Sequence, residues 1–450
     1  MSAAELLVSA RRSLTGALLL PHDDGFDAAR LPWNLAVAQH PAAVAIPAGV
    51  DDLRVLLQAA RDSGLRIAVQ PSGHGASGDL AETILVRMSR FDDLRVDTQE
   101  GVVTAGAGVS WGAVVSALEG SGWAAPAGTS PVVSVAGYTL NGGHSWFSRT
   151  AGLGSDNLRA VWLLRPDGSH DRIDDDTDPE LMWSLRGAAG VVGIVTALEI
   201  DLVPTPHPWG ASLMFDAADS AAVLRAVRDL APEAPASLNV FVNSMRMPDV
   251  PLLPDEVRGR SFVAVQLLSA DGAAASALDA LCAAAAPLRQ AEGPTSPAAL
   301  IAQSNEPTEP MAGRGVSAAL TGMDDRLIDA LIDFRERPEQ WPLMGVELRM
   351  LGGALRTPRR PGFAGVGSSE WLVHGLAPLF PDAPALAGEA SLAGLADVLA
   401  PAASDRLVPT FLSAGETLER SAPTADLERL RAVRERLDPE ALLHEGRLPR

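Results

Sequence analysis

A glycine-rich loop with one histidine in its middle is the first segment of this sequence that could do chemistry. It reads Pro71-Ser72-Gly73-His74-Gly75-Ala76-Ser77-Gly78 and follows the apolar segment 65–70. Residues this small let backbone N–H groups approach a phosphate closely. The loop therefore predicts a site for a phosphate-bearing ligand, with His74 placed inside it.

Two more glycine-rich segments follow. One runs through Ala127-Gly128-Thr129-Ser130-Pro131 and then residues 135–144. It could equally be a loop whose glycines only satisfy turn geometry. The other, residues 106–112, is similar to a dinucleotide fingerprint, but its glycine spacing is off by one. No acidic residue lies about 20 positions further on to hold a ribose, so we interpret it as an ordinary strand-to-helix turn.

Three side chains are candidates for acid–base work. Glu347 and Arg349 lie two apart on an expected strand and therefore share one face of it. That strand enters Leu351-Gly352-Gly353, where missing bulk would let another group approach the backbone. His374 lies on the next expected strand, and His144 ends the second glycine-rich segment. Each could instead be a paired surface residue or a structural histidine.

The composition excludes several kinds of chemistry. All 36 basic side chains among the 450 residues are arginines, which rules out a P-loop lysine or a lysine Schiff base. Cys282 is the only cysteine, so we expect no disulfide within the chain and no metal site. The formal net charge of −20 argues against nucleic acid or an anionic membrane as a partner. We find no membrane-spanning stretch and no signal cleavage site, and expect a cytoplasmic protein.

The elements that would position these residues follow two patterns. Residues 43–205 alternate short apolar strands with helices, and the proline-rich segment 203–208 is typical of a domain boundary. Beyond it, residues 211–286 have a strand–helix–strand–strand–helix order, which favours an antiparallel sheet covered by helices on one face. Residues 287–315 carry five prolines and predict a long loop, and a last helix is expected over 426–437.

The order of these segments resembles the FAD-linked oxidases whose flavin domain is of the para-cresol methylhydroxylase (PCMH) and vanillyl-alcohol oxidase type. Within that class the chain is most similar to the berberine-bridge-enzyme-like (BBE-like) and 6-hydroxynicotine-oxidase branch. Each motif is weak alone, but six in order span nearly the whole chain. The segments that carry the resemblance are 70–77, 128–148, 149–157, 180–187 with 193–196, 351–354 and 437–439.

The resemblance implies an α+β fold in three parts. Residues 1–205 would form a two-subdomain PCMH-type FAD-binding domain. Residues 206–404 would form a substrate domain, an antiparallel sheet covered by helices. Residues 405–450 would return to the FAD domain.

The resemblance also implies how FAD is held. His74 occupies the position that is bonded covalently to the 8α-methyl of FAD, a step in which a neutral imidazole nitrogen acts as the nucleophile. Many members form a second bond through a cysteine where this chain has Ser130, and serine cannot form a thioether. We therefore predict one covalent link only. The expected FAD-binding residues are Pro71, Ser72, Gly73, His74, Gly75, Ser77, Thr129, Ser130, Ser134, Gly137, Tyr138, Gly142, Gly143, Gly193 and Val195.

Two departures from the family pattern affect the function. Tyr138 is the only tyrosine, and by analogy it faces the ribityl chain of the flavin, where it is poorly placed as a base. The usual Asp-Pro-x-Asn near the C-terminus reads Asp438-Pro439-Glu440-Ala441. The catalytic base is therefore expected among His374, Glu347 and His144.

The resemblance thus implies an oxidase that takes a hydride from a C–H next to a hydroxyl or amine of a small molecule. Molecular oxygen would be the acceptor, and bacterial secondary metabolism the setting. The alternative is a flavin-bound protein without oxidase activity, either a non-redox catalyst or a small-molecule binder. The sequence leaves open the identity of the substrate and the oligomeric state.

Overall fold

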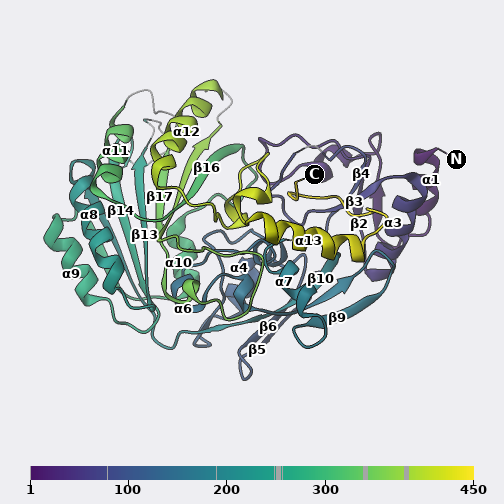
Figure 1. Ribbon diagram of the computed structural model, residues 1–450, viewed down its shortest axis with the longest axis horizontal. Helices are drawn as coiled ribbons and strands as arrows, with labels where there is room; N and C mark the ends of the chain where they lie inside the picture. The colour runs from purple at the N-terminus through teal and green to yellow at the C-terminus, as the bar shows by residue number, and fades with distance from the viewer. Residues whose placement is uncertain are drawn as a thin grey trace.

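The chain folds into two lobes that lie side by side (Figure 1). The structure is a computed structural model that describes every residue except 1, 79, 189, 248, 250–254, 256, 338–342, 380–384 and 450, and leaves out the side chains of 385–387. One lobe contains the N-terminal part of the chain and the C-terminal helix, and the other is built around one large sheet (Figure 1).

The first sheet of the N-terminal lobe carries the histidine loop at one end. Its strand order is β1 (Ala17–Leu19), β2 (Ala43–Ile46), β4 (Thr83–Val86) and β3 (Arg66–Val69), with parallel pairing of β4 to both β2 and β3. Helix α3 (Val50–Ser63) buries Leu53, Leu56, Leu57 and Ala60, the i, i+3, i+4, i+7 set of an amphipathic helix. The helix ends at Gly64, which adopts the left-handed conformation that glycine tolerates best.

A second, five-stranded sheet completes this lobe. Its order is β5 (Leu94–Asp97), β6 (Val102–Gly106), β10 (Ile194–Asp201), β8 (Leu158–Leu164) and β9 (His170–Asp174), and every neighbouring pair is antiparallel. Four short helices lie between its strands in the sequence, and they are α4 (Trp111–Ala117), α5 (Val135–Thr139), α6 (Ser148–Ala151) and α7 (Pro179–Leu185).

The other lobe is a seven-stranded antiparallel sheet with helices on one face (Figure 1). Alternate side chains such as Val240, Val346 and Val373 belong to a core that they share with these helices. The antiparallel sheet expected from the sequence is confirmed, and the whole is an α+β fold. The strands in spatial order are β15 (Arg289–Pro294), β12 (Trp209–Asp216), β14 (Ser261–Ser269), β13 (Leu238–Arg246), β17 (Gly345–Met350), β18 (Trp371–Pro378) and β16 (Gly313–Leu320), and the helices are α8 (Ser220–Leu230), α9 (Ala275–Ala284), α11 (Asp325–Glu336) and α12 (Ala385–Leu399).

The expected long loop over 287–315 is wrong. This segment holds β15, helix α10 (Pro297–Ser304) and the start of β16. Pro297 opens α10 at a position where a missing N–H costs nothing, and the side chain of Ser296 accepts a hydrogen bond from the N–H of Ala299. The proline-rich segment 203–208 also pairs at its start, since β11 (Val203–Pro204) lies beside β7 (Trp123–Ala124).

The end of the chain packs on the N-terminal lobe. Helix α13 (Thr424–Leu437) contacts α7 and buries Leu427, Leu430 and Val433 in the core of that lobe. The N–H of Ile67, on β3, donates to the carbonyl of Leu442 at 2.7 Å. None of the described helices is long and apolar enough to cross a membrane.

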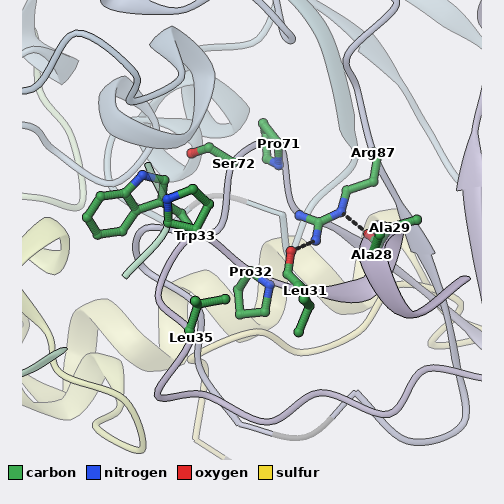
Figure 2. A pocket seen from close by; sticks show the side chains of 10 residues that line it. Ala28, Ala29, Leu31, Pro32, Trp33, Leu35, Pro71, Ser72 and Arg87 are labelled. Atoms are coloured by element: carbon green, nitrogen blue, oxygen red, sulfur yellow. Dashed lines mark hydrogen bonds between the residues drawn. The ribbon is translucent and has the colours of Figure 1, made fainter. Parts of the chain in front are cut away.

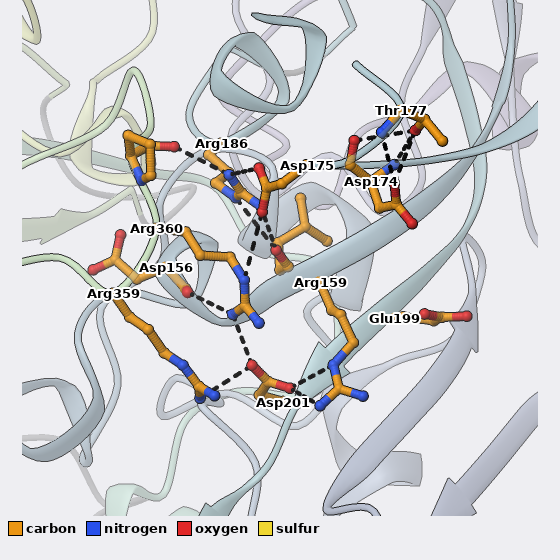
Figure 3. A network of polar contacts seen from close by, with 12 residues as sticks. Asp156, Arg159, Asp174, Asp175, Thr177, Arg186, Glu199, Asp201, Arg359 and Arg360 are labelled. Carbon is orange, nitrogen blue, oxygen red and sulfur yellow. Dashed lines mark hydrogen bonds and ion pairs between the residues drawn. The ribbon is translucent and has the colours of Figure 1, made fainter. Parts of the chain in front are cut away.

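A network of arginines and carboxylates fastens the loop between β17 and β18 to the N-terminal lobe (Figure 3). Asp201 is almost fully buried and receives Arg159 at 2.8 Å and Arg360 at 2.7 Å. Arg186, which is completely buried, holds both oxygens of Asp175 at 2.7 Å. Breaking such a buried pair on one side would leave an uncompensated charge, so the network holds the two lobes in one arrangement.

Arg149 makes a second connection and explains Gly352-Gly353. Its guanidinium donates to the carbonyls of Leu351 and Leu238. A Cβ on Gly353, which has φ +57°, would lie 2.3 Å from the carbonyl oxygen of Arg149. The close approach expected at this diglycine therefore exists, but a side chain and backbone of the protein fill it.

Candidate active site

His74 is held by two neighbours and keeps one nitrogen free. Its ring stacks on Trp33, with centroids 4.2 Å apart and planes at 15°. Its Nδ1 lies 3.0 Å from the hydroxyl of Ser72, and its Nε2 is buried without a hydrogen-bond partner among the described residues. Burial lowers the pKa of His74 to about 4, so the imidazole is neutral at pH 7. A neutral, oriented imidazole is what nucleophilic attachment to a cofactor requires.

The two glycine-rich loops present free donors. Within the described chain, the backbone N–H groups of residues 72–75 and 128–130 donate to no protein acceptor. The side-chain oxygens of Ser130, Tyr138 and Thr139 are buried and also lack partners there. Buried polar groups in proteins are normally satisfied, so these side-chain oxygens call for a polar ligand, to which the backbone N–H groups would offer further donors. The phosphates, ribityl hydroxyls and ring carbonyls of FAD supply matching acceptors and donors, and the residues fit this cofactor.

Packing within the protein explains why a glycine is needed beside Tyr138. Gly143 has φ +70°, and a Cβ there would lie 2.3 Å from the Tyr138 ring. That ring packs edge-on against Trp111, with centroids 5.6 Å apart. Turn geometry and packing thus explain Gly143, and its contact with a flavin stays a prediction. Burial raises the pKa of Tyr138, which keeps it protonated and agrees with its exclusion as a base.

A row of polar side chains crosses four neighbouring strands of the large sheet. Ser317 on β16 pairs with His374 on β18, His374 pairs with Glu347 on β17, and Glu347 pairs with Asn243 on β13. Directly paired residues project from the same face of a sheet. Their neighbours along the strands belong to the core under the helices, so this polar row lies on the opposite face.

Arg349 organises the acid–base candidates. It forms an ion pair with Glu347 and donates to the carbonyl of His144 at 3.3 Å. Its guanidinium carbon lies 4.6 Å from the ring centre of Phe241 and 5.2 Å from that of Phe411. The structure therefore brings Glu347 and His144 together through one buried cation.

The three candidates differ in access. His144 is 1% exposed, and burial holds its pKa well below the usual value, with Arg349 acting in the same direction. Glu347 is tied to Arg349. His374 is only partly buried, and its Nδ1 lies 2.8 Å from the Ser317 hydroxyl. Burial lowers its pKa, so it is neutral at pH 7 and able to accept a proton at Nε2 when Nδ1–H donates to Ser317.

Glu306 is a titratable residue that the sequence analysis missed. It follows α10, and its carboxylate accepts a hydrogen bond from the hydroxyl of Thr129. Glu306 is exposed at the surface, but desolvation of its carboxyl by the surrounding protein is the main cause that raises the pKa, and nearby Glu347 acts in the same direction. The expected long loop over 287–315 gives Glu306 no defined position. The described residues hold no group of three side chains suited to a metal ion.

Comparison with known proteins identifies part of the N-terminal lobe. Residues 41–174 match the family model described as an FAD binding domain. This range contains both glycine-rich loops, with their free donors. Residues 41–174 are therefore an FAD binding domain, and the expectation of FAD as the cofactor is confirmed.

The (R)-6-hydroxynicotine oxidase of Paenarthrobacter nicotinovorans is 30% identical over 247 residues, 53% of this chain and 54% of that protein. The chain thus spans about half the length of this curated relative. The solved structure of BBE-like 1 from Physcomitrella patens gives a TM-score of 0.82 at 18% identity, covering 100% of this chain and 99% of that one. Glucooligosaccharide oxidase from Acremonium strictum, described with a 6-S-cysteinyl, 8α-N1-histidyl FAD, gives 0.79 at 19%, covering 99% and 98%. The resemblance to the BBE-like and 6-hydroxynicotine-oxidase branch is confirmed, and its fold is the fold of this chain.

Proposed function

We propose that the protein is an FAD-dependent oxidase of a small molecule that carries a hydroxyl or amine next to the reacting C–H. The observation that carries this proposal is the placement of His374. It is a neutral, partly exposed imidazole in a polar row, on the face of the sheet turned away from the covering helices. The FAD binding domain supplies the other half of the site.

His74 would attach FAD covalently, and the free N–H groups of residues 72–75 and 128–130 would hold its polar parts. The histidyl FAD of glucooligosaccharide oxidase supports this assignment. Ser130 stands where that class of relative uses cysteine, so we propose a single link. Bound FAD supplies a hydride acceptor that oxygen can reoxidise.

The residues of the large sheet would handle the proton. Oxidation of an alcohol removes a hydride from carbon and a proton from oxygen, and His374 Nε2 would take that proton. Ser317 fixes the ring through Nδ1, and Glu347 beside it stabilises the imidazolium that results. Oxygen would take up the two electrons and two protons removed from the substrate and leave as hydrogen peroxide, so that atoms and electrons balance.

The relatives suggest the chemical class of the substrate. A hydroxynicotine oxidase and an oligosaccharide oxidase point to polar molecules, and the polar row of Ser317, His374, Glu347 and Asn243 is suited to hydroxyl or amine groups. A role in bacterial secondary metabolism and a cytoplasmic location remain proposals that rest on the sequence.

Anaerobic photoreduction followed by air tests the oxidase proposal. The holoenzyme should bleach under light and regain its yellow colour within seconds of aeration, with one peroxide formed per flavin. A flavin that stays reduced in air would favour the alternative, a flavin-bound protein that does not use oxygen. Screening sugars, hydroxylated N-heterocycles and amines for peroxide release then identifies the substrate class.

A further inference from the structure

We propose that a pocket behind the histidine loop, lined by Arg87, Trp33 and Pro71 among others, binds a small monocarboxylate with an apolar body. The pocket has a volume of about 460 Å³ and is open to solvent. Figure 2 shows the guanidinium of Arg87 directed toward its interior, with Trp33, Pro32 and Leu35 on the opposite side. Pockets of this volume are in the range that holds a small organic ligand.

Arg87 supplies the charge that such a ligand needs. Arg87 is only 9% exposed, and its side chain donates to the carbonyls of Ala29, Gln70 and Leu31 at 3.0, 3.1 and 2.6 Å. These bonds use three of its five N–H donors. Among the described residues Arg87 has no acidic partner, and its pKa, lowered to about 10 by burial, leaves it charged at neutral pH.

A buried cation without a counter-ion is costly, and an entering carboxylate would relieve that cost. Carbonyl oxygens carry only partial charge, so they solvate the guanidinium without neutralising it. The two remaining N–H groups can take a carboxylate in a charge-assisted hydrogen bond, which is stronger than a neutral one. The charge therefore favours an anion over a neutral or cationic ligand.

The apolar residues that line the pocket determine which uncharged part of a ligand would fit. Leu31 and Leu35 line this pocket, and the two residues are 47% and 43% exposed. Pro32, Pro71 and the Trp33 ring continue the apolar lining. Burying apolar surface stabilises a complex by about 25 cal/mol per Å² of apolar area removed from water, which favours a ligand with an aromatic or short aliphatic body. A sugar phosphate would leave its hydroxyls without hydrogen-bond partners against this lining.

The pocket is separate from the polar row of the large sheet but touches the histidine loop. Trp33 lines the pocket and stacks on His74, and Ser72 lines it and hydrogen-bonds His74. An occupant would therefore contact both residues that orient His74. None of Ser317, His374, Glu347 and Asn243 lines the pocket.

Calorimetric titration of the holoenzyme with 3-phenylpropionate and with its neutral amide tests this site. The acid should bind with a Kd below 1 mM and at least tenfold more tightly than the amide, since a hydrogen bond to a charged group contributes about 1.5–3 kcal/mol. Equal binding of acid and amide, or no heat from either, would overturn the proposal.

Rim variants keep the test independent of folding. Leu35→Asp should weaken acid binding about tenfold, whether its charge repels the ligand or pairs with Arg87, whereas the neutral Leu35→Asn should keep the preference for the acid over the amide. His374→Ala should bind the acid as the parent does. A loss of binding in His374→Ala would assign the ligand to the active site, and unchanged binding in Leu35→Asp would show that the pocket is not used.

Discussion

Glu347 and His374 stand opposite each other on β17 and β18, and each is held by a different partner. Arg349 binds the carboxylate, while the Ser317 hydroxyl lies 2.8 Å from the imidazole. The pair therefore combines a fixed negative charge with an accessible neutral base. The carboxylate opposes the lowering of the His374 pKa that burial causes. This division of roles makes His374 the proton acceptor and Glu347 its electrostatic support.

His74→Ala should release the flavin. The parent should give a yellow pellet on acid precipitation and gain the mass of one FAD, because the buried Nε2 has no protein partner and is available for attachment. The variant should give a colourless pellet and a yellow supernatant. His207→Ala, which removes an exposed histidine outside the glycine-rich loops, serves as the control and should keep the flavin. Free flavin from the parent would contradict covalent attachment.

Ser130→Cys should gain a second flavin bond. The hydroxyl of Ser130 is buried beside Thr129 and lacks a partner among the described residues. A thiol there could form the thioether that serine cannot form. Peptide mapping should find one flavin peptide in the parent and two in the variant. A second flavin peptide in the parent, including one that contains Cys282, would show that the single-link proposal is wrong.

Asp156 should make stability depend on pH. Burial is the main cause that raises its pKa to about 7, although the N–H of Leu153 donates to its carboxyl. A carboxyl whose pKa is higher in the folded than in the unfolded state releases its proton from the unfolded chain first. Its contribution to stability is therefore complete below the unfolded-state pKa and is lost as the pH rises to the folded-state pKa. The free energy of unfolding should therefore fall between about pH 4 and pH 7, by at most about 4 kcal/mol from this group.

Urea unfolding at a series of pH values, with Asp156→Asn as the comparison, checks this prediction. The amide keeps an oxygen for the Leu153 N–H but does not titrate. The parent should lose more stability than the variant across this pH range, and parallel curves would contradict the assignment.

Gly353→Ala should destabilise the contact between the lobes. A Cβ there would meet the carbonyl oxygen of Arg149 at 2.3 Å, and the backbone has a positive φ that alanine tolerates poorly. We expect a loss of about 2–4 kcal/mol in the free energy of unfolding. Gly365→Ala is the matched control, because its Cβ would meet nothing within 4 Å. Equal effects of the two changes in urea unfolding would contradict this account.

The sequence predicted those elements whose signal is local. Helix α3 shows its buried face as a regular spacing of leucines, β17 appears as an alternation of polar and apolar residues, and β18 appears as a mostly apolar run. The segment 287–315 gave no such signal, because β15 is an exposed edge strand without alternation and Pro297 opens a helix rather than ending one. Glu306 lies in that segment, so the sequence did not predict it as a candidate site residue.

The residues of the candidate site were likewise predictable only where their signal is local in the sequence. The loop around His74 was found because its glycines and histidine are adjacent in sequence, and Glu347 and His374 because their strands were found. Ser317 could not be found, since its pairing with His374 depends on the strand order β17–β18–β16. Arg149 reaches the carbonyl of Leu351 across about 200 residues of chain, and no local pattern predicts so distant a contact.

The rate of anaerobic flavin reduction in His374→Ala tests the central claim most directly. With substrate in excess, stopped-flow absorbance should show reduction slowed about 10²–10⁴-fold, the usual contribution of a positioned base. FAD should stay bound, the subsequent reaction with oxygen should keep its rate, and His207→Ala, a change at the surface, should leave both steps unchanged. Reduction of His374→Ala at the parent's rate would contradict the claim that His374 accepts the proton.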